Sequence, residues 1–139
     1  MIKTMMKQLL ATIQADVSPE QITSAVHAYL DSWRAGDTQA RAALFADHAV
    51  VEDPVGGPAI EGKDAIVAFW QGVTAYPTTY TPALESIVVC GNEAMVKFSL
   101  TINVTDLGSG TVHILENFVL DSTGKIVRLR AFWDENTVS

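Results

Sequence analysis

The order of two periodic patterns along the chain constrains its fold more than any other feature. Between residues 18 and 36, apolar side chains recur every three or four positions, which is the spacing of one helix face. Later in the chain, runs rich in β-branched and aromatic residues predict strands over 84–90, 94–104, 111–121 and 125–133. Helices followed by a run of antiparallel strands favour an α+β architecture, in which the helices pack on one face of a curved sheet.

Capping residues define the predicted helices of the first half. Ser18 and Gln21 form a capping box, and Gly36 ends the helix that begins there. Asp37 is placed to cap the next helix. The elements that follow are a helix over residues 37–45, a short strand over 49–52 and a helix over 63–73.

The length of the chain predicts a single domain. The chain has 139 residues and contains no stretch rich enough in proline, glycine or serine to separate two domains. We expect residues 17–139 to form one domain and residues 1–16 to be an N-terminal extension. Thr12 and Gln14 interrupt the apolar run of this extension, and no small-residue cleavage site follows, so a signal peptide is not predicted.

Charge and composition limit the expected partners. The formal net charge is −7, and an acidic surface repels phosphate backbones, so we expect no nucleic-acid partner. No stretch approaches the roughly 20 apolar residues of a membrane span, so no membrane association is expected either. A single cysteine, Cys90, excludes an internal disulfide and suits a cytoplasmic location. The histidines His27, His48 and His113 are dispersed, so we expect neither a metal nor a cofactor.

Three polar side chains stand where the patterns call for apolar ones. Tyr29 lies on the apolar face of the first helix, and Asp53 ends a hydrophobic strand. Glu116 lies in the middle of a strand, on a face that is otherwise apolar. Burying a carboxylate is costly unless it is paired or protonated, and an apolar environment raises its pKa and favours the neutral acid. Each residue also has an ordinary structural explanation, such as pairing of Glu116 with an arginine of the next strand.

Together these residues resemble the bacterial ketosteroid isomerases of the nuclear transport factor 2-like superfamily. The resemblance extends over roughly residues 18–135 and rests on Tyr29, on ADHAVVEDPVG at 46–56, on IEGKDAIVAF at 60–69, on GKI at 124–126 and on AFW at 131–133. It implies a cone-like curved sheet, antiparallel or mixed, with three N-terminal helices packed on its concave face. The layout alone is less specific, because the superfamily hosts many functions.

The resemblance also implies roles for the three polar residues. Asp53 corresponds to the catalytic base, and Tyr29 corresponds to the tyrosine that hydrogen-bonds the oxyanion. Glu116 falls where the family has an aspartate as second oxyanion donor, and its extra methylene displaces the carboxyl by about 1.5 Å. Further tyrosines that hydrogen-bond the oxyanion tyrosine in the family correspond here to Phe45 and Trp70.

The reaction implied moves a β,γ double bond into conjugation with the ketone of a steroid-like substrate, by intramolecular proton transfer. The partner expected is therefore a small hydrophobic ketone, and the family usually forms homodimers through the sheet. Residues expected to contact the substrate are Trp70, Phe69, Phe45, Val112, Ile114, Phe118, Leu129, Ala131 and Trp133.

Two other interpretations stay open. A polyketide cyclase-like enzyme would also use an acid–base carboxylate on a conjugated ketone, whereas an epoxide hydrolase-like enzyme needs an Asp-Arg-Asp set that the sequence does not reveal. A non-catalytic module for small hydrophobic ligands would seal Glu116 in a charge pair, for instance with Arg130, and fill the cavity with Trp70. Nothing in the sequence separates a steroid from another β,γ-unsaturated ketone.

Overall fold

The chain folds into helices followed by long strands, in the order that the two patterns predict. The computed structural model describes residues 1–139. Its elements in chain order are α1 (Ile2–Leu10), α2 (Pro19–Ala35), α3 (Thr38–Ala42), β1 (Phe45–Glu52), β2 (Ile60–Glu61), α4 (Lys63–Val73), β3 (Thr78–Cys90), β4 (Glu93–Val104), β5 (Gly108–Leu120), β6 (Ile126–Phe132) and a 3-10 turn at Glu135–Thr137.

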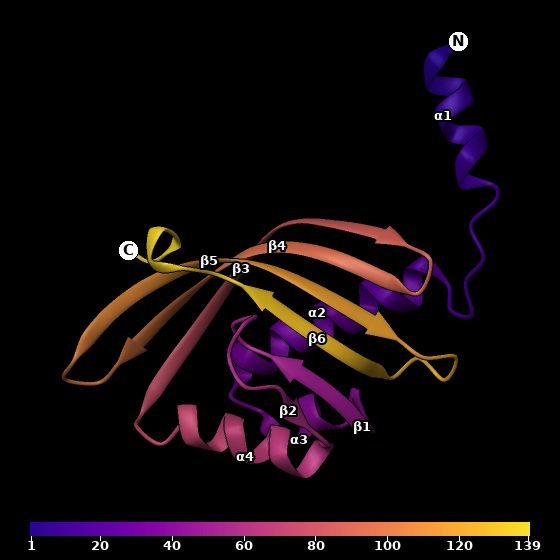
Figure 1. Cartoon of the computed structure of the whole chain (residues 1–139). Coiled ribbons are helices and arrows are strands. Elements are labelled where there is room, and N and C mark those ends of the chain that lie inside the picture. The colour runs from indigo at the N-terminus through magenta and orange to yellow at the C-terminus, as the bar shows by residue number, and fades with distance from the viewer.

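All strands belong to one mixed sheet in the order β2-β1-β6-β5-β4-β3. Strands β3 to β6 pair antiparallel with one another, whereas β1 pairs parallel to β6. Figure 1 shows the sheet curving over α2, with α4 on the same side. The sheet is curved and open, and the helices on one side of it give the α+β class expected.

Local signals set both ends of α2 and the start of α3 correctly. In the capping box of α2, the Gln21 amide donates to Ser18 Oγ at 3.1 Å and the Ser18 amide donates to Gln21 Oε1 at 2.8 Å. Gly36 ends α2 with a φ of 65°, a conformation that glycine adopts without steric cost. The Asp37 side chain accepts from the Ala40 amide at 2.9 Å and so caps α3.

Several predicted limits are wrong: the end of α3 and the starts of β1, β3 and β5, the last of which begins at Gly108 instead of residue 111. The helix expected over 37–45 ends at Ala42, and β1 begins at Phe45 instead of residue 49. Phe45 pairs with Ile126 of β6, and the Ile126 amide donates to the Leu44 carbonyl at 2.8 Å. Strand β3 begins at Thr78 instead of residue 84 and includes Pro82, which an edge strand tolerates because no further strand needs its missing N–H.

The core lies between α2, α4 and the covered face of the sheet. Its largest fully buried apolar side chains are Ile22, Val26, Ile66, Trp70, Phe45, Val51, Phe118, Val96, Leu120, Ile126 and Leu129. Burying one such side chain stabilises the fold by about 1.5–3 kcal/mol, so this layer fixes the helices on the sheet and positions the residues around it.

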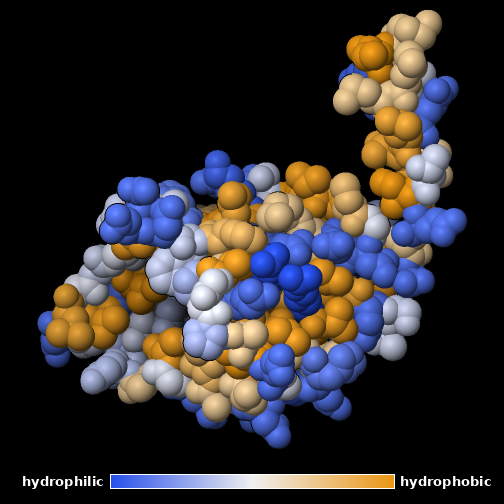
Figure 2. Space-filling model, viewed as in Figure 1, coloured by the Kyte–Doolittle hydropathy of each residue, from blue (hydrophilic) through white to orange (hydrophobic).

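The helix α1 stands apart from this core. None of its residues is buried, and Figure 1 shows it projecting away from the sheet. Apolar side chains cover much of its surface in Figure 2, among them the exposed Ile2, Met5, Met6 and Leu9. None of the helices combines the length and apolar character that crossing a bilayer requires. The division into an extension and a domain stays a prediction.

Candidate active site

A cavity of about 560 Å³ opens between the covered face of the sheet and the helices α2 and α4. Its apolar lining consists of Leu30, Trp33, Pro54, Phe69, Val73, Tyr76, Tyr80, Phe98, Leu100, Ile102, Val104, Leu107, Val112, Ile114 and Trp133. Figure 2 shows the surface hollowed between the tip of the β4–β5 hairpin and the end of α4. Cavities of roughly 300–1,000 Å³ with mainly apolar walls are typical of sites for small molecules.

Tyr29, Asp53 and Glu116 all line this cavity, although they come from distant parts of the chain. Tyr29 lies in the middle of α2, on the face that packs toward the sheet. Asp53 directly follows β1, and the Val55 amide ties this loop to β6 by donating to the Ala131 carbonyl at 2.9 Å. Glu116 lies in β5 opposite Val96 of β4, so its side chain points to the covered face. The structure therefore brings together the three residues that the sequence singled out.

Glu116 is held in an environment that disfavours its charge. The residue is only 3% exposed, and its Oε1 atom has no hydrogen-bond partner in the protein. Burial raises the pKa of Glu116 well above its ordinary value, and the charge of Asp53 adds to this, while the facing Tyr29 hydroxyl offsets part of it. These effects favour the neutral form of Glu116, and a neutral carboxyl can donate a hydrogen bond into the cavity.

Asp53 lies in a different environment. Its side chain is half-buried, and its Oδ1 atom accepts a hydrogen bond of 2.8 Å from the indole Nε1 of Trp133. Burial raises the pKa of Asp53, and the Trp133 hydrogen bond lowers it again in part. Because a donor stabilises its charged form, Asp53 is the group of this pair that ionises first.

Tyr29 is packed among aromatic rings. Its ring centroid lies 5.2 Å from that of Phe118, 6.1 Å from that of Phe45 and 6.4 Å from that of Trp33. Burial raises the pKa of Tyr29 well above its ordinary value, followed by the charges of Glu116 and Asp53, while Trp33 and Arg41 lower it in part. The Tyr29 hydroxyl thus keeps its proton and can act as a second donor beside Glu116.

The predicted substrate contacts divide into two groups. Phe69, Val112, Ile114 and Trp133 line the cavity as expected. The others are buried in the core and do not line it, and they are Trp70, Phe45, Phe118, Leu129 and Ala131. For Trp70 and Phe45 the reason is packing, because the two rings contact each other edge-on within the core, with centroids 5.2 Å apart.

Sequence reasoning missed part of the lining, such as Trp33 of α2 and Tyr80 of β3, and two further features of the site. One is the far end of β4 with the following loop, which contributes Leu100, Ile102, Val104 and Leu107 to the lining. The alternation of Leu100, Ile102 and Val104 places them on one face of β4. The sequence does not tell where α2 stops covering that face and leaves it open to the cavity. The other is Trp133, which was expected to be an apolar contact and in fact also donates to Asp53. Only the parallel pairing of β1 with β6 brings these two residues together.

Charged groups near the site bear on the other interpretations. Arg130 pairs with Glu52 at 3.1 Å, and Arg128 approaches the same carboxylate at 3.9 Å. Neither arginine seals Glu116, and no arginine lines the cavity. The structure contains no group of three or more histidine, cysteine, aspartate or glutamate residues placed to hold a metal ion.

Comparisons with known proteins show the family of the chain and similar folds. Residues 26–131 match the SnoaL-like domain family. The steroid Delta-isomerase of Nocardioides simplex is 36% identical over 115 residues, which cover 81% of this chain and 89% of that protein. A Delta 5-3-ketosteroid isomerase from Mycobacterium sp. shares the fold with a TM-score of 0.76 at 23% identity, over 86% of this chain and 97% of that one. The epoxide hydrolase/cyclase-like enzyme SalBIII shares it with a TM-score of 0.78 at 21% identity, over 86% and 95% of the chains.

Proposed function

Because the chain belongs to the SnoaL-like domain family and has a steroid Delta-isomerase among its relatives, we propose that it is a steroid isomerase-like enzyme. Its reaction moves a β,γ double bond into conjugation with the ketone of a steroid-like substrate. The observation that carries the proposal is the meeting of Asp53 with Tyr29 and Glu116 in one apolar cavity.

The proposed reaction uses one base twice. Ionised Asp53 takes a proton from the carbon between the ketone and the double bond, which gives a dienolate and a neutral Asp53. The same proton then returns to the γ carbon, so the double bond ends in conjugation with the ketone and Asp53 is ionised again. Protons and electrons balance within the substrate and this carboxyl, and no other reactant takes part.

Tyr29 and Glu116 are the proposed donors to the dienolate oxygen. Both groups keep their protons because they are buried, and both line the cavity that Asp53 enters. Donors that are fixed before the reaction stabilise the charge that develops on the oxygen without reorganisation. A carboxylic acid kept neutral by an apolar site is the device already known for ketosteroid isomerases.

The substrate class follows from the lining of the cavity. Apart from Tyr29, Asp53 and Glu116, the walls are mostly apolar, so a ligand gains affinity mainly by burying apolar surface. This supports a small hydrophobic ketone. The features expected of a non-catalytic module are missing, since Glu116 has no charged partner and Trp70 does not fill the cavity. The homodimer and the cytoplasmic location stay predictions.

The test is isomerisation of 5-androstene-3,17-dione by the purified protein, followed by the ultraviolet absorbance of the conjugated product. Asp53→Asn is expected to lower kcat by a factor of about 10²–10⁴, the usual contribution of a general base. Asp47→Asn is the matched control, because this aspartate also lies at β1 but its side chain is 96% exposed. Equal activity of the wild type and Asp53→Asn, or a folded wild type without turnover, would refute the proposal, and the second outcome favours a cyclase-like reaction.

A further inference from the structure

Arg41 is a buried cation without a charged partner. It lies in α3, is only 1% exposed and takes part in no ion pair. Its Nη1 atom is buried and has no hydrogen-bond partner. Burying an unpaired charge is unfavourable, so a structural link between α2 and α3 alone is a poor explanation for an arginine at this position.

A chain of hydrogen bonds connects Arg41 to Tyr29. The Nε atom of Arg41 donates to Ser32 Oγ at 3.0 Å, and Ser32 Oγ donates to the Tyr29 carbonyl at 2.6 Å. The Nη2 atom of Arg41 also donates to the Ser32 carbonyl at 3.2 Å. All three residues are buried, so solvent does not compete for these bonds. Arg41 thereby holds the turn of α2 that carries Tyr29.

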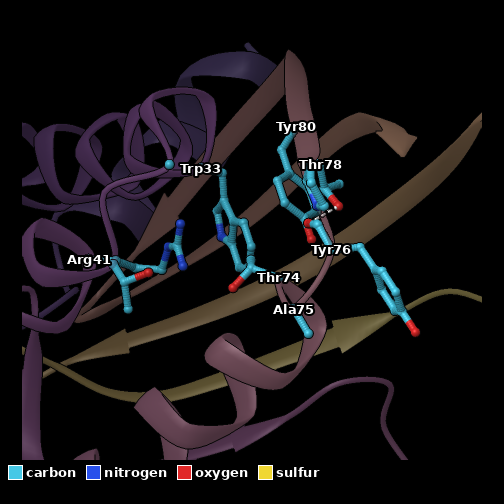
Figure 3. Close-up of a pocket in the computed structure, with 10 residues that line it drawn as sticks. Trp33, Arg41, Thr74, Ala75, Tyr76, Thr78 and Tyr80 are labelled. Carbon is cyan, nitrogen blue, oxygen red and sulfur yellow. Dashed lines mark hydrogen bonds between the residues drawn. The ribbon is translucent and has the colours of Figure 1, made fainter. Parts of the chain in front are cut away.

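A second connection runs through an aromatic ring. The guanidinium carbon of Arg41 lies 3.4 Å from the centroid of the Trp33 ring, and Figure 3 shows the two side chains next to each other. The Trp33 ring in turn contacts Tyr29 edge-on, and both line the cavity. An arginine over an indole is attracted by the ring, and the attraction is stronger in a desolvated site. The position of Arg41 therefore fixes the wall against which Tyr29 packs.

The charge of Arg41 also affects the electrostatics around the Tyr29 hydroxyl. Charges interact more strongly in a buried environment than in water, so the Arg41 cation favours negative charge at the oxygen of Tyr29. Burial lowers the pKa of Arg41, while Tyr29, Tyr80 and Asp37 raise it. The other titratable groups that face Tyr29 are Glu116 and Asp53, and both disfavour negative charge there.

We propose that Arg41 is a positioning residue of the reaction, which holds Tyr29 through Ser32 and Trp33 and stabilises the negative charge that the dienolate places beside Tyr29. This inference rests on the proposed function, and it separates two contributions. The hydrogen bonds to Ser32 orient Tyr29, whereas the charge of Arg41 lowers the energy of an anion in the cavity.

The effect of the Arg41 charge is tested with 4-nitrophenol as a bound probe. The visible absorbance of the nitrophenolate anion reports the ionisation of the bound probe without turnover. A Tyr29→Phe variant establishes that the probe sits at Tyr29. Replacing the cation in Arg41→Met is expected to raise the apparent pKa of the bound nitrophenol by about one unit, a tenfold change in its ionisation equilibrium. Arg34→Met is the matched control, since Arg34 lies on α2 and its side chain is half exposed, beside Asp31.

The positioning is tested by turnover of 5-androstene-3,17-dione. Ser32→Ala breaks the hydrogen-bond chain but keeps the charge, so it is expected to lower kcat with little change in KM and in nitrophenol ionisation. Arg41→Lys is expected to do the same, because lysine restores the cation without the guanidinium geometry. These two variants keep the inference testable if Arg41→Met does not fold, which thermal unfolding reports.

The outcomes separate this inference from the proposed function. A wild type that isomerises the ketone, with kcat unchanged in Ser32→Ala and Arg41→Lys, overturns the positioning role alone. A folded Arg41→Met with unchanged nitrophenol ionisation overturns the role of the charge. In a third outcome, the wild type does not isomerise the ketone, but the nitrophenol bound to Arg41→Met has a higher pKa than that bound to the wild type. This result refutes the proposed reaction and supports the electrostatic effect of Arg41.

Discussion

Replacing Trp133 by phenylalanine tests how the protein keeps Asp53, the proposed base, ionised. The indole Nε1 of Trp133 donates to Asp53 Oδ1 at 2.8 Å, and this bond lowers a pKa that burial raises. Phenylalanine keeps most of the apolar surface of the tryptophan but cannot donate a hydrogen bond. The variant therefore removes one stabilising contact of the Asp53 anion and leaves the cavity wall largely intact.

The size of the effect follows from the exposure of the bond. A hydrogen bond to a charged group contributes about 1.5–3 kcal/mol when it is shielded from solvent. Trp133 is 38% exposed, so water competes for the Asp53 carboxylate and the lower end of this range applies. A loss of about 1.4 kcal/mol corresponds to a rise of about one unit in the pKa of Asp53.

The assay is the pH dependence of kcat/KM for 5-androstene-3,17-dione. On the acid side activity falls as Asp53 is protonated, so in Trp133→Phe this limb should move to higher pH by about one unit. The alkaline limb is the internal control, because it depends on Tyr29 and Glu116, which the substitution leaves in place. An acid limb at the same pH in both proteins would show that Trp133 does not tune the base, or that Asp53 is not the base.

Three further predictions concern stability and the extension. Glu116→Gln should reduce the fall in stability that the wild type shows as pH rises above 4.5. Folding raises the pKa of Glu116, so its ionisation favours the unfolded chain, whereas the contribution of Asp53 to the fall remains; urea midpoints at several pH values measure the difference. Ser18→Ala should lower the unfolding free energy by about 1 kcal/mol in urea denaturation, because it removes the N-terminal cap of α2. Deleting residues 1–13 should leave kcat/KM and the melting temperature unchanged, because the helix α1 buries no residue; a lower melting temperature would show that the extension packs on the domain in solution.

Both ends of α2 could be predicted from the sequence because their causes are local. The capping box of α2 needs only Ser18 and Gln21, and its end needs only Gly36. The start of β1 could not be predicted in the same way. Phe45 belongs to a strand because it pairs with Ile126, which lies far away in the chain, and no local signal reports such a parallel pairing.

The same distinction applies to the site. Tyr29, Asp53 and Glu116 could be found because each is a polar residue on a face that the local pattern marks as apolar. The cavity lining could be predicted only in part. Strand alternation places both Leu129 and Ile114 on the covered face of the sheet, yet Ile114 lines the cavity and Leu129 belongs to the closed core. Which apolar residues face a cavity depends on where helices cover the sheet, and that is decided by packing over the whole domain.

The two carboxyl groups of the cavity show how packing gives the same functional group different pKa values. Glu116 is fully enclosed, and its Oε1 has no donor, so burial keeps it neutral. Asp53 is buried as well, but the Trp133 indole supplies a donor, and its negative charge further disfavours ionisation of Glu116. In the proposed reaction, the difference between the base Asp53 and the acid Glu116 thus depends on one hydrogen bond as much as on burial. If this reasoning is correct, Trp133→Phe brings the two pKa values closer together and narrows the pH range of activity from its acid side.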